Sequence, residues 1–154
     1  MARWTKLAML AIAIGAWMAA TQGAFARSNE VYTALFSSLG AGGYDVVAYF
    51  KQGKAVPGDA AFATVYKGAT WHFASAEDQE LFRKNPAAYV PQYGGYCAWA
   101  VSQNYTAAGD PEVWRIVNGK LYFNYDRNVQ AKWNANVAAD IQAADRNWPS
   151  VLDK

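Results

Sequence analysis

The sequence has very little of the chemistry that metal sites and catalytic sites commonly use. Its 154 residues include one cysteine, Cys97, and one histidine, His72. A structural zinc site normally takes four ligands, most of them thiolates and imidazoles. One ligand of each kind excludes a zinc site closed by cysteine and histidine within a single chain. A lone cysteine also excludes an internal disulfide, because it can pair only with another molecule.

Net charge is missing from most of the chain as well. There are 14 Lys and Arg residues against 12 Asp and Glu residues, and the excess of two corresponds to Arg3 and Lys6 at the very start. The rest of the chain is formally neutral. It lacks the basic field that binding to nucleic acid or to anionic lipid requires, so we expect neither partner.

The first 26 residues have the pattern of a secretory signal peptide. Arg3 and Lys6 precede an apolar run over 7–20, and small residues stand at both recognition positions of Ala24-Phe25-Ala26. The run is shorter than the ~20 residues that cross a bilayer. We predict cleavage after Ala26 and a periplasmic or secreted product with no membrane association; a retained membrane anchor is the alternative. All three methionines lie in this segment.

Two stretches predict β-hairpins, and each is followed by a helix pattern. "FATVYKGATWHFAS" alternates around Lys67-Gly68, and "EVWRIVNGKLYFNYD" alternates around Asn118-Gly119, which is a strong hairpin turn. Ser75 and Asp78 form a capping pattern for the first helix. The second helix has an apolar stripe at every fourth residue, which is typical of an amphipathic helix: Val129, Trp133, Val137 and Ile141.

A shift of 51 residues aligns the two stretches. It pairs Gly68 with Gly119, Trp71 with Tyr122, Ser75 with Asp126 and Phe82 with Trp133. Both Ser and Asp can cap a helix. The sequence therefore predicts an α+β fold: a small single domain of two β-hairpins with two or three helices, arranged as pseudo-duplicated hairpin-helix units that share one core.

The predicted domain extends over 43–154 and follows an N-terminal arm over 27–42. Ser28 would cap a short helix that extends to Leu39 in this arm, and Gly40 to Gly43 would end it. The residues expected in the core are Trp71, Phe73, Phe82, Tyr89, Trp99, Trp114, Leu121, Phe123, Val129, Trp133, Val137 and Ile141.

Cys97 and His72 are the candidate metal ligands. A soft Cu(I) ion could accept both, and Zn(II) could add carboxylates to them. This requires two residues that are 25 apart in sequence to meet in space. His72 lies between Trp71 and Phe73, so strand alternation places it on the opposite face from them. The alternatives are an ordinary strand histidine and a cysteine that packs as a small core residue. A further alternative is a nucleophilic pair in which His72 activates Cys97, but the sequence shows no acid that would orient the histidine.

Aromatic residues are abundant, with five tryptophans and ten tyrosines after residue 26. Large rings that carry a polar atom tend to keep one end in water. Tyr96 and Trp99 flank Cys97 in "PQYGGYCAWA" and are the candidate ligand-binding residues; an aromatic pocket would suit a planar, sugar-like or peptide ligand. The alternative is a small core filled with rings.

The order of motifs in this sequence resembles that of the exported bacterial YHS-domain proteins. The stretches that carry the resemblance are "GYDVVAYFKQGKAVPG", "GATWHFASAEDQELFRKNPAAYVPQYGGYCAWAVSQ", "DPEVWRIVNGKLYFNYD" and the final "NWP". Its most specific piece is the run with Phe82, Asn85, Pro86 and Tyr89, and its extent is roughly Gly43 to Pro149. The resemblance implies a small α+β domain related to cysteine-rich metal-binding modules. Where those relatives have F-C-S-x-x-C, this chain has Ala74 and Asp78 at the thiol positions.

These observations predict a periplasmic, non-enzymatic YHS-domain binding protein. Its ligand would be a metal ion such as copper or zinc, or a small molecule. No catalytic residue is assigned. Two alternatives of other classes stay open: a thiol-dependent enzyme that uses Cys97 and His72, and an envelope protein-interaction module that presents an aromatic surface.

Overall fold

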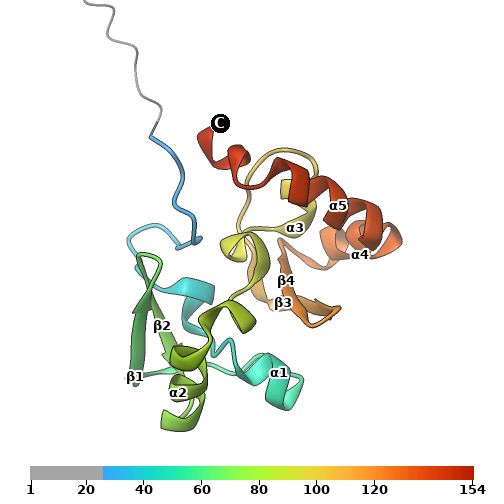
Figure 1. Ribbon diagram of the computed structural model, residues 1–154. Coiled ribbons are helices and arrows are strands. Elements are labelled where there is room, and N and C mark those ends of the chain that lie inside the picture. Colours follow the sequence, from blue (N-terminus) through green and yellow to red (C-terminus); the bar gives the residue numbers. More distant parts are fainter. Residues whose placement is uncertain (1–25) are drawn as a thin grey trace, which may run out of the picture.

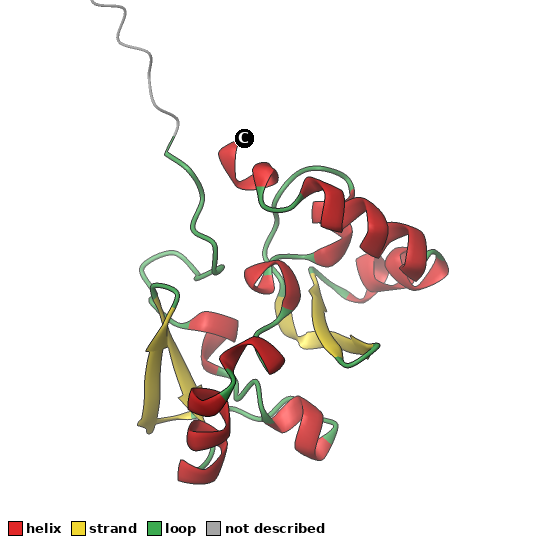
Figure 2. Ribbon diagram, viewed as in Figure 1, coloured by secondary structure: helices red, strands yellow, loops and turns green. Residues whose placement is uncertain are grey.

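The computed structural model describes residues 26–154, so residues 1–25 of the predicted signal peptide lie outside the described residues. A first unit, residues 40–88, contains η1 (Gly40–Gly43), α1 (Ala48–Gln52), β1 (Asp59–Tyr66), β2 (Ala69–Phe73), α2 (Ala76–Lys84) and η2 (Pro86–Ala88). A second unit, residues 92–135, contains η3 (Gln92–Gly95), α3 (Ala98–Ser102), β3 (Asp110–Val117), β4 (Lys120–Asn124) and α4 (Arg127–Ala135). The chain ends with α5 (Val137–Asn147) and η4 (Ser150–Asp153). Figures 1 and 2 show the two hairpins apart from each other, with α2 beside β1-β2 and α4 near β4.

The two units repeat each other, which confirms the predicted pseudo-duplication. Both hairpins, β1-β2 and β3-β4, are antiparallel two-stranded sheets, and both have an irregular register near the start of the first strand. The bounds of β1, β2 and α2 recur 51 residues later in β3, β4 and α4. The turns match as well: φ is 50° and 75° at Lys67 and Gly68, and 50° and 74° at Asn118 and Gly119.

The helices α2 and α4 are attached in the same way, each to its own unit. Ser75 caps α2 and Asp126 caps α4, each by accepting a hydrogen bond from the backbone N–H three residues later. Gln79 of α2 donates its side-chain amide to the Ala63 carbonyl oxygen, at 2.6 Å. Gln130 of α4 makes the equivalent bond to Trp114, at 3.0 Å. These glutamines fix each helix to the first strand of its own hairpin.

The helix expected over Ser28–Leu39 is wrong. This segment is an extended arm with a turn at its end, because other parts of the chain supply its hydrogen bonds. The Ser28 N–H donates to the Leu152 carbonyl oxygen, and the Tyr32 N–H donates to that of Gly94, both at 2.9 Å. Phe36 has a φ of 61°, which no right-handed helix contains.

The apolar stripe from Val129 to Ile141 belongs to two helices rather than one. Asn136 separates α4 from α5 with a φ of −140° and a ψ of 37°. Val129 and Trp133 therefore lie on α4, while Val137 and Ile141 lie on α5. With the short helices α1 and α3, residues 26–154 contain five α-helices, whereas two or three were expected. None of the helices in this described range is both long and apolar enough to cross a membrane.

The buried residues form two core clusters, whereas one shared core was expected. One cluster contains residues of both units, and the other belongs to the second unit and the C-terminal end of the chain. Tyr49 of α1 packs edge-on against the Trp114 ring at 5.0 Å and lies 5.7 Å from the Phe123 ring, both in the second unit. Its hydroxyl donates to the Pro111 carbonyl oxygen at 2.7 Å. Half of the expected core residues are fully buried: Trp71, Phe73, Phe82, Leu121, Phe123 and Trp133. The others are partly buried; all of them except Val129 pack against the core clusters.

Asp45 organises the first unit from a fully buried position. One carboxylate oxygen accepts hydrogen bonds from the N–H groups of Val47 and Ala48, and the other accepts one from Ala74. Burial raises the pKa of Asp45, with these N–H groups opposing the rise. The carboxylate thereby connects the start of α1 to the end of β2.

We expect Asp45→Ala to lower the free energy of unfolding by roughly 3 kcal/mol, because three N–H groups in the interior lose their acceptor. Urea denaturation followed by circular dichroism measures the change. Asp59→Ala is the matched control, since Asp59 is exposed and accepts only the Ala61 N–H. Equal losses in the two variants would contradict the role assigned to Asp45.

Candidate functional site

Cys97 lies at the start of α3, directly after the turn of η3, and is 1% exposed. Its N–H donates to the Ala107 carbonyl oxygen at 2.9 Å, which holds the backbone in place. Its thiol donates to Oδ1 of Asn124 at 3.7 Å. The same oxygen accepts the N–H of Trp99 at 3.2 Å. Asn124 thus fixes both the thiol and the first turn of α3.

A cavity of about 200 Å³, here named the Cys97 pocket, opens beside this thiol. Its walls are apolar or aromatic and come from α3, the loop after it, the end of β4 and the start of α4. The lining residues are Cys97, Trp99, Ala100, Tyr105, Ala107, Tyr125 and Val129. None of these side chains carries a formal charge at neutral pH.

Aromatic rings form much of the mouth of the Cys97 pocket. Tyr105 and Tyr125 are 46% and 56% exposed, which is unusual for large rings in this protein. Trp99 meets Tyr105 edge-on, with 6.4 Å between ring centroids. The Lys132 ammonium lies 5.2 Å from the Trp99 ring centroid, in cation-π geometry. The pocket therefore has an uncharged interior with one cation beside it.

The environment of Cys97 favours its neutral thiol. Burial raises the pKa of the Cys97 thiol, and this effect exceeds the opposing effect of hydrogen bonds from the N–H groups of Ala100, Tyr125 and Trp99. A thiol with a raised pKa is a poor nucleophile at neutral pH, because the thiolate is the reactive form.

The equivalent place in the first unit is filled with charged groups. Asp45 stands where the second unit has Cys97, because the shift before the first short helix is 52 residues, as from η1 to η3. The Asp45 N–H donates to the Val56 carbonyl oxygen at 2.8 Å, as that of Cys97 donates to Ala107. Asp78 stands where the second unit has Val129, and its carboxylate is paired with the Lys51 ammonium at 2.7 Å. The two units share a backbone arrangement, but only the second unit has an apolar pocket here.

The structure places His72 in the first unit, away from the Cys97 pocket. Trp71 and Phe73 are buried while His72 is only partly buried, as the alternation predicted. His72 lies against Gly58 and Gly43, and it is not among the residues that line the Cys97 pocket. Within residues 26–154, no three His, Cys, Asp or Glu side chains gather as a metal-ligand set.

Of the two candidate ligand-binding aromatics, Trp99 lines the Cys97 pocket and Tyr96 does not. Tyr96 is buried on the other side of the chain, where its hydroxyl donates to the Asn29 carbonyl oxygen at 2.9 Å. Its ring packs against Tyr32 and Trp148. Tyr96 therefore holds the N-terminal arm against the second unit.

Sequence reasoning missed Tyr105, Tyr125 and Val129 as pocket residues. They come from three different segments, and no local motif connects them. A usable signal was present in the repeat itself: the aligned stretches pair Asp78 with Val129. An acid in one unit opposite an apolar residue in the other indicates a site where the two units differ.

The thiol positions of the metal-binding relatives do not fit a metal here. Ala74 has no ligand atom in its side chain, and its N–H is bonded to Asp45. The Asp78 carboxylate is nearly fully buried, and the Lys51 ammonium neutralises it.

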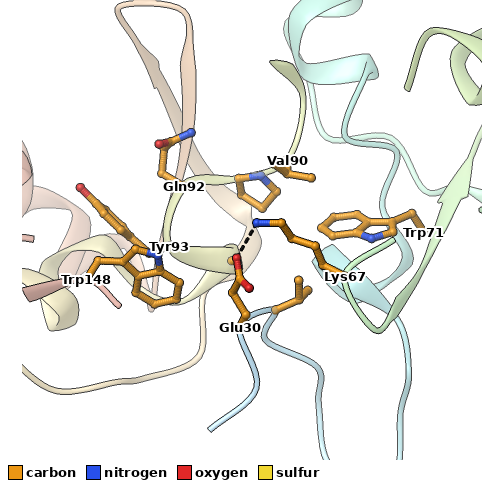
Figure 3. Close-up of a pocket in the computed structure, with 10 residues that line it drawn as sticks. Glu30, Lys67, Trp71, Val90, Gln92, Tyr93 and Trp148 are labelled. Carbon is orange, nitrogen blue, oxygen red and sulfur yellow. Dashed lines mark hydrogen bonds and ion pairs between the residues drawn. The ribbon is translucent and has the colours of Figure 1, made fainter. Parts of the chain in front are cut away.

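A second cavity, of about 150 Å³, lies between the two units and is here named the inter-unit cavity. Figure 3 shows the Lys67 amine between Trp71 on one side and Tyr93 and Trp148 on the other. Lys67 forms an ion pair with Glu30 of the N-terminal arm. The other lining residues are Val31, Val90, Pro91, Gln92 and Gly94.

The comparison with family models gives one match. The model described as "YHS domain" matches residues 47–93, less than a third of the chain and less than the resemblance over Gly43 to Pro149 implied. No curated protein and no solved structure matches the chain significantly. The matched segment runs from the start of α1 into η3, so the similarity to the YHS model lies mainly in the first unit and does not include the residues that line the Cys97 pocket.

Proposed function

We propose that this protein is a periplasmic, non-enzymatic binding protein whose Cys97 pocket takes a small neutral molecule with a planar apolar body. The observation that carries the proposal is an uncharged pocket of about 200 Å³, lined by three aromatic side chains and a buried thiol. The signal-peptide pattern of residues 1–26 supports a location outside the cytoplasm.

The size and chemistry of the pocket define the ligand class. An apolar cavity of ~150 Å³ is large enough for benzene, so a molecule of one or two fused rings suits this pocket. Trp99, Tyr105 and Tyr125 offer stacking and edge-on contacts to such rings. A charged ligand would lose its hydration without gaining an opposite charge inside the pocket.

The state of Cys97 supports binding rather than thiol catalysis. A catalytic cysteine needs a base or a lowered pKa, whereas burial raises the pKa of Cys97 and the thiol donates to Asn124. Copper or zinc would need a second strong ligand, and no other lining residue of the pocket is a His, Cys, Asp or Glu.

Indole is a suitable probe for the first test, because it is neutral, planar and bicyclic. We expect isothermal titration calorimetry to show indole binding to the wild-type protein. Ala107→Leu should weaken this binding at least tenfold, because the larger side chain fills the pocket while the backbone bond from Cys97 is kept.

Ala61→Leu is the matched control: Ala61 is exposed on β1, in the first unit, and its substitution should leave indole binding unchanged. Two results would contradict the proposed binding of a neutral ring compound. One is no binding of indole or similar neutral ring compounds to the wild type; the other is retention of Zn(II) or Cu(I) by the wild type and its loss in Cys97→Ala.

The reactivity of the single thiol gives a second test. We expect iodoacetamide to alkylate Cys97 at least tenfold more slowly at neutral pH than it alkylates free cysteine. The alkylation rate should rise with pH, and the midpoint of this rise should lie above the ordinary pKa range of a thiol. The reason is that a raised pKa moves formation of the thiolate to higher pH. Bound indole should slow the reaction further.

Mass spectrometry of the alkylated chain measures these rates without ambiguity, because Cys97 is the only cysteine. Rapid alkylation at neutral pH would instead favour the thiol-dependent enzyme.

A further inference from the structure

We propose that the inter-unit cavity is a second ligand site, which takes a small carboxylate with a one-ring or branched apolar body. This site is separate from the Cys97 pocket, since the two cavities share no lining residue.

The cation of this site is held in position by the fold. Lys67 is at the tip of the β1-β2 hairpin, where the tight turn with Gly68 fixes its backbone. Its ammonium lies in the cavity between the aromatic side chains, as Figure 3 shows. The Lys67 ammonium donates a hydrogen bond to the Glu30 carboxylate, which raises the pKa of Lys67, and the ammonium is charged at neutral pH. An ammonium of this kind is the natural partner of a ligand carboxylate.

Apolar side chains form part of the walls around this cation, and the polar atoms of two of the rings, Trp71 and Tyr93, are bonded elsewhere. The Trp71 indole N–H donates to the Tyr66 carbonyl oxygen at 3.0 Å. The Tyr93 hydroxyl donates to Asp145 at 2.8 Å. Val31, Val90 and Pro91 complete the lining near these rings. The site thus places the Lys67 ammonium beside apolar side chains, with Glu30 and Gln92 as polar groups in the same lining, and this combination suits a small carboxylate with an apolar body.

Glu30 already occupies the place that a ligand carboxylate would take. The side chains of Lys67 and Glu30 are 44% and 50% exposed, and exposed ion pairs contribute only ~0–1 kcal/mol. The arm that carries Glu30 is fixed by other bonds, from Tyr32 to Gly94 and from Tyr96 to Asn29. The Glu30 side chain can therefore turn away without displacing the arm. Glu30 is an internal competitor for the Lys67 ammonium.

The volume sets the size of the ligand. A cavity of about 150 Å³ is comparable to apolar cavities that accept benzene. Benzoate combines one ring with one carboxylate and is the probe of choice. Benzamide has nearly the same shape without the charge.

The test is calorimetric titration of benzoate and benzamide into the full mature chain. We expect benzoate to bind at least tenfold more tightly than benzamide, and Lys67→Gln to remove this difference. Glu30→Gln should tighten benzoate binding about threefold, because a competing ion pair of ~0.7 kcal/mol is removed. Lys54→Gln is the control, since Lys54 is exposed outside the cavity. Thermal melts establish that the variants are folded.

The Glu30→Gln result separates a ligand site from a structural ion pair, because a purely structural pair predicts no gain in affinity. Equal binding of benzamide, unchanged binding in Lys67→Gln, weaker or unchanged binding in Glu30→Gln, or no binding of benzoate would each overturn the proposal. Ala107→Leu should leave benzoate binding intact, and Lys67→Gln should leave indole binding intact. Failure at one cavity is therefore distinguishable from failure at the other.

Discussion

A two-stranded β-hairpin is at most marginally stable in water, because it has too little apolar surface to bury by itself. This protein contains two such hairpins in separate sheets, and neither extends the other. Each hairpin is fixed to its own helix through Gln79 or Gln130, and one core cluster contains residues of both hairpins. Tyr49 shows the dependence directly: it is a helix residue of the first unit whose ring contacts lie in the second. The need to share this core cluster keeps the two units together.

The shared core also explains where the cavities are. The inter-unit cavity lies where the N-terminal arm, the first hairpin, the connecting segment and Trp148 meet. These parts do not all come from one unit, so neither unit forms this cavity alone. The Cys97 pocket lies within the second unit, at the place where the first unit is filled by Asp45, Asp78 and Lys51. A duplicated backbone allows one unit to keep a structural charge network while the other opens a pocket.

Local signals in the sequence were sufficient for the elements that local interactions stabilise. Asn118-Gly119 is favoured in the tight turn that it forms, and Ser75 satisfies an N–H at the start of its own helix. The arm over Ser28–Leu39 was mispredicted because two of its N–H groups, those of Ser28 and Tyr32, bond to residues more than 60 positions away. The spacing of Val129, Trp133, Val137 and Ile141 was also misleading, since two consecutive helices can continue one apolar stripe.

The sequence by itself determined the α+β class, the repeat, the scarcity of metal ligands and the position of the only thiol, because these follow from residue types and short-range spacing. Trp99 was identified as a pocket residue for the same reason, being close to Cys97 in the chain. Only the tertiary structure decided that Tyr96 faces the arm, that His72 does not line the Cys97 pocket, and that Tyr105, Tyr125 and Val129 do. These relations depend on packing between distant segments, which residue types and short-range spacing do not specify.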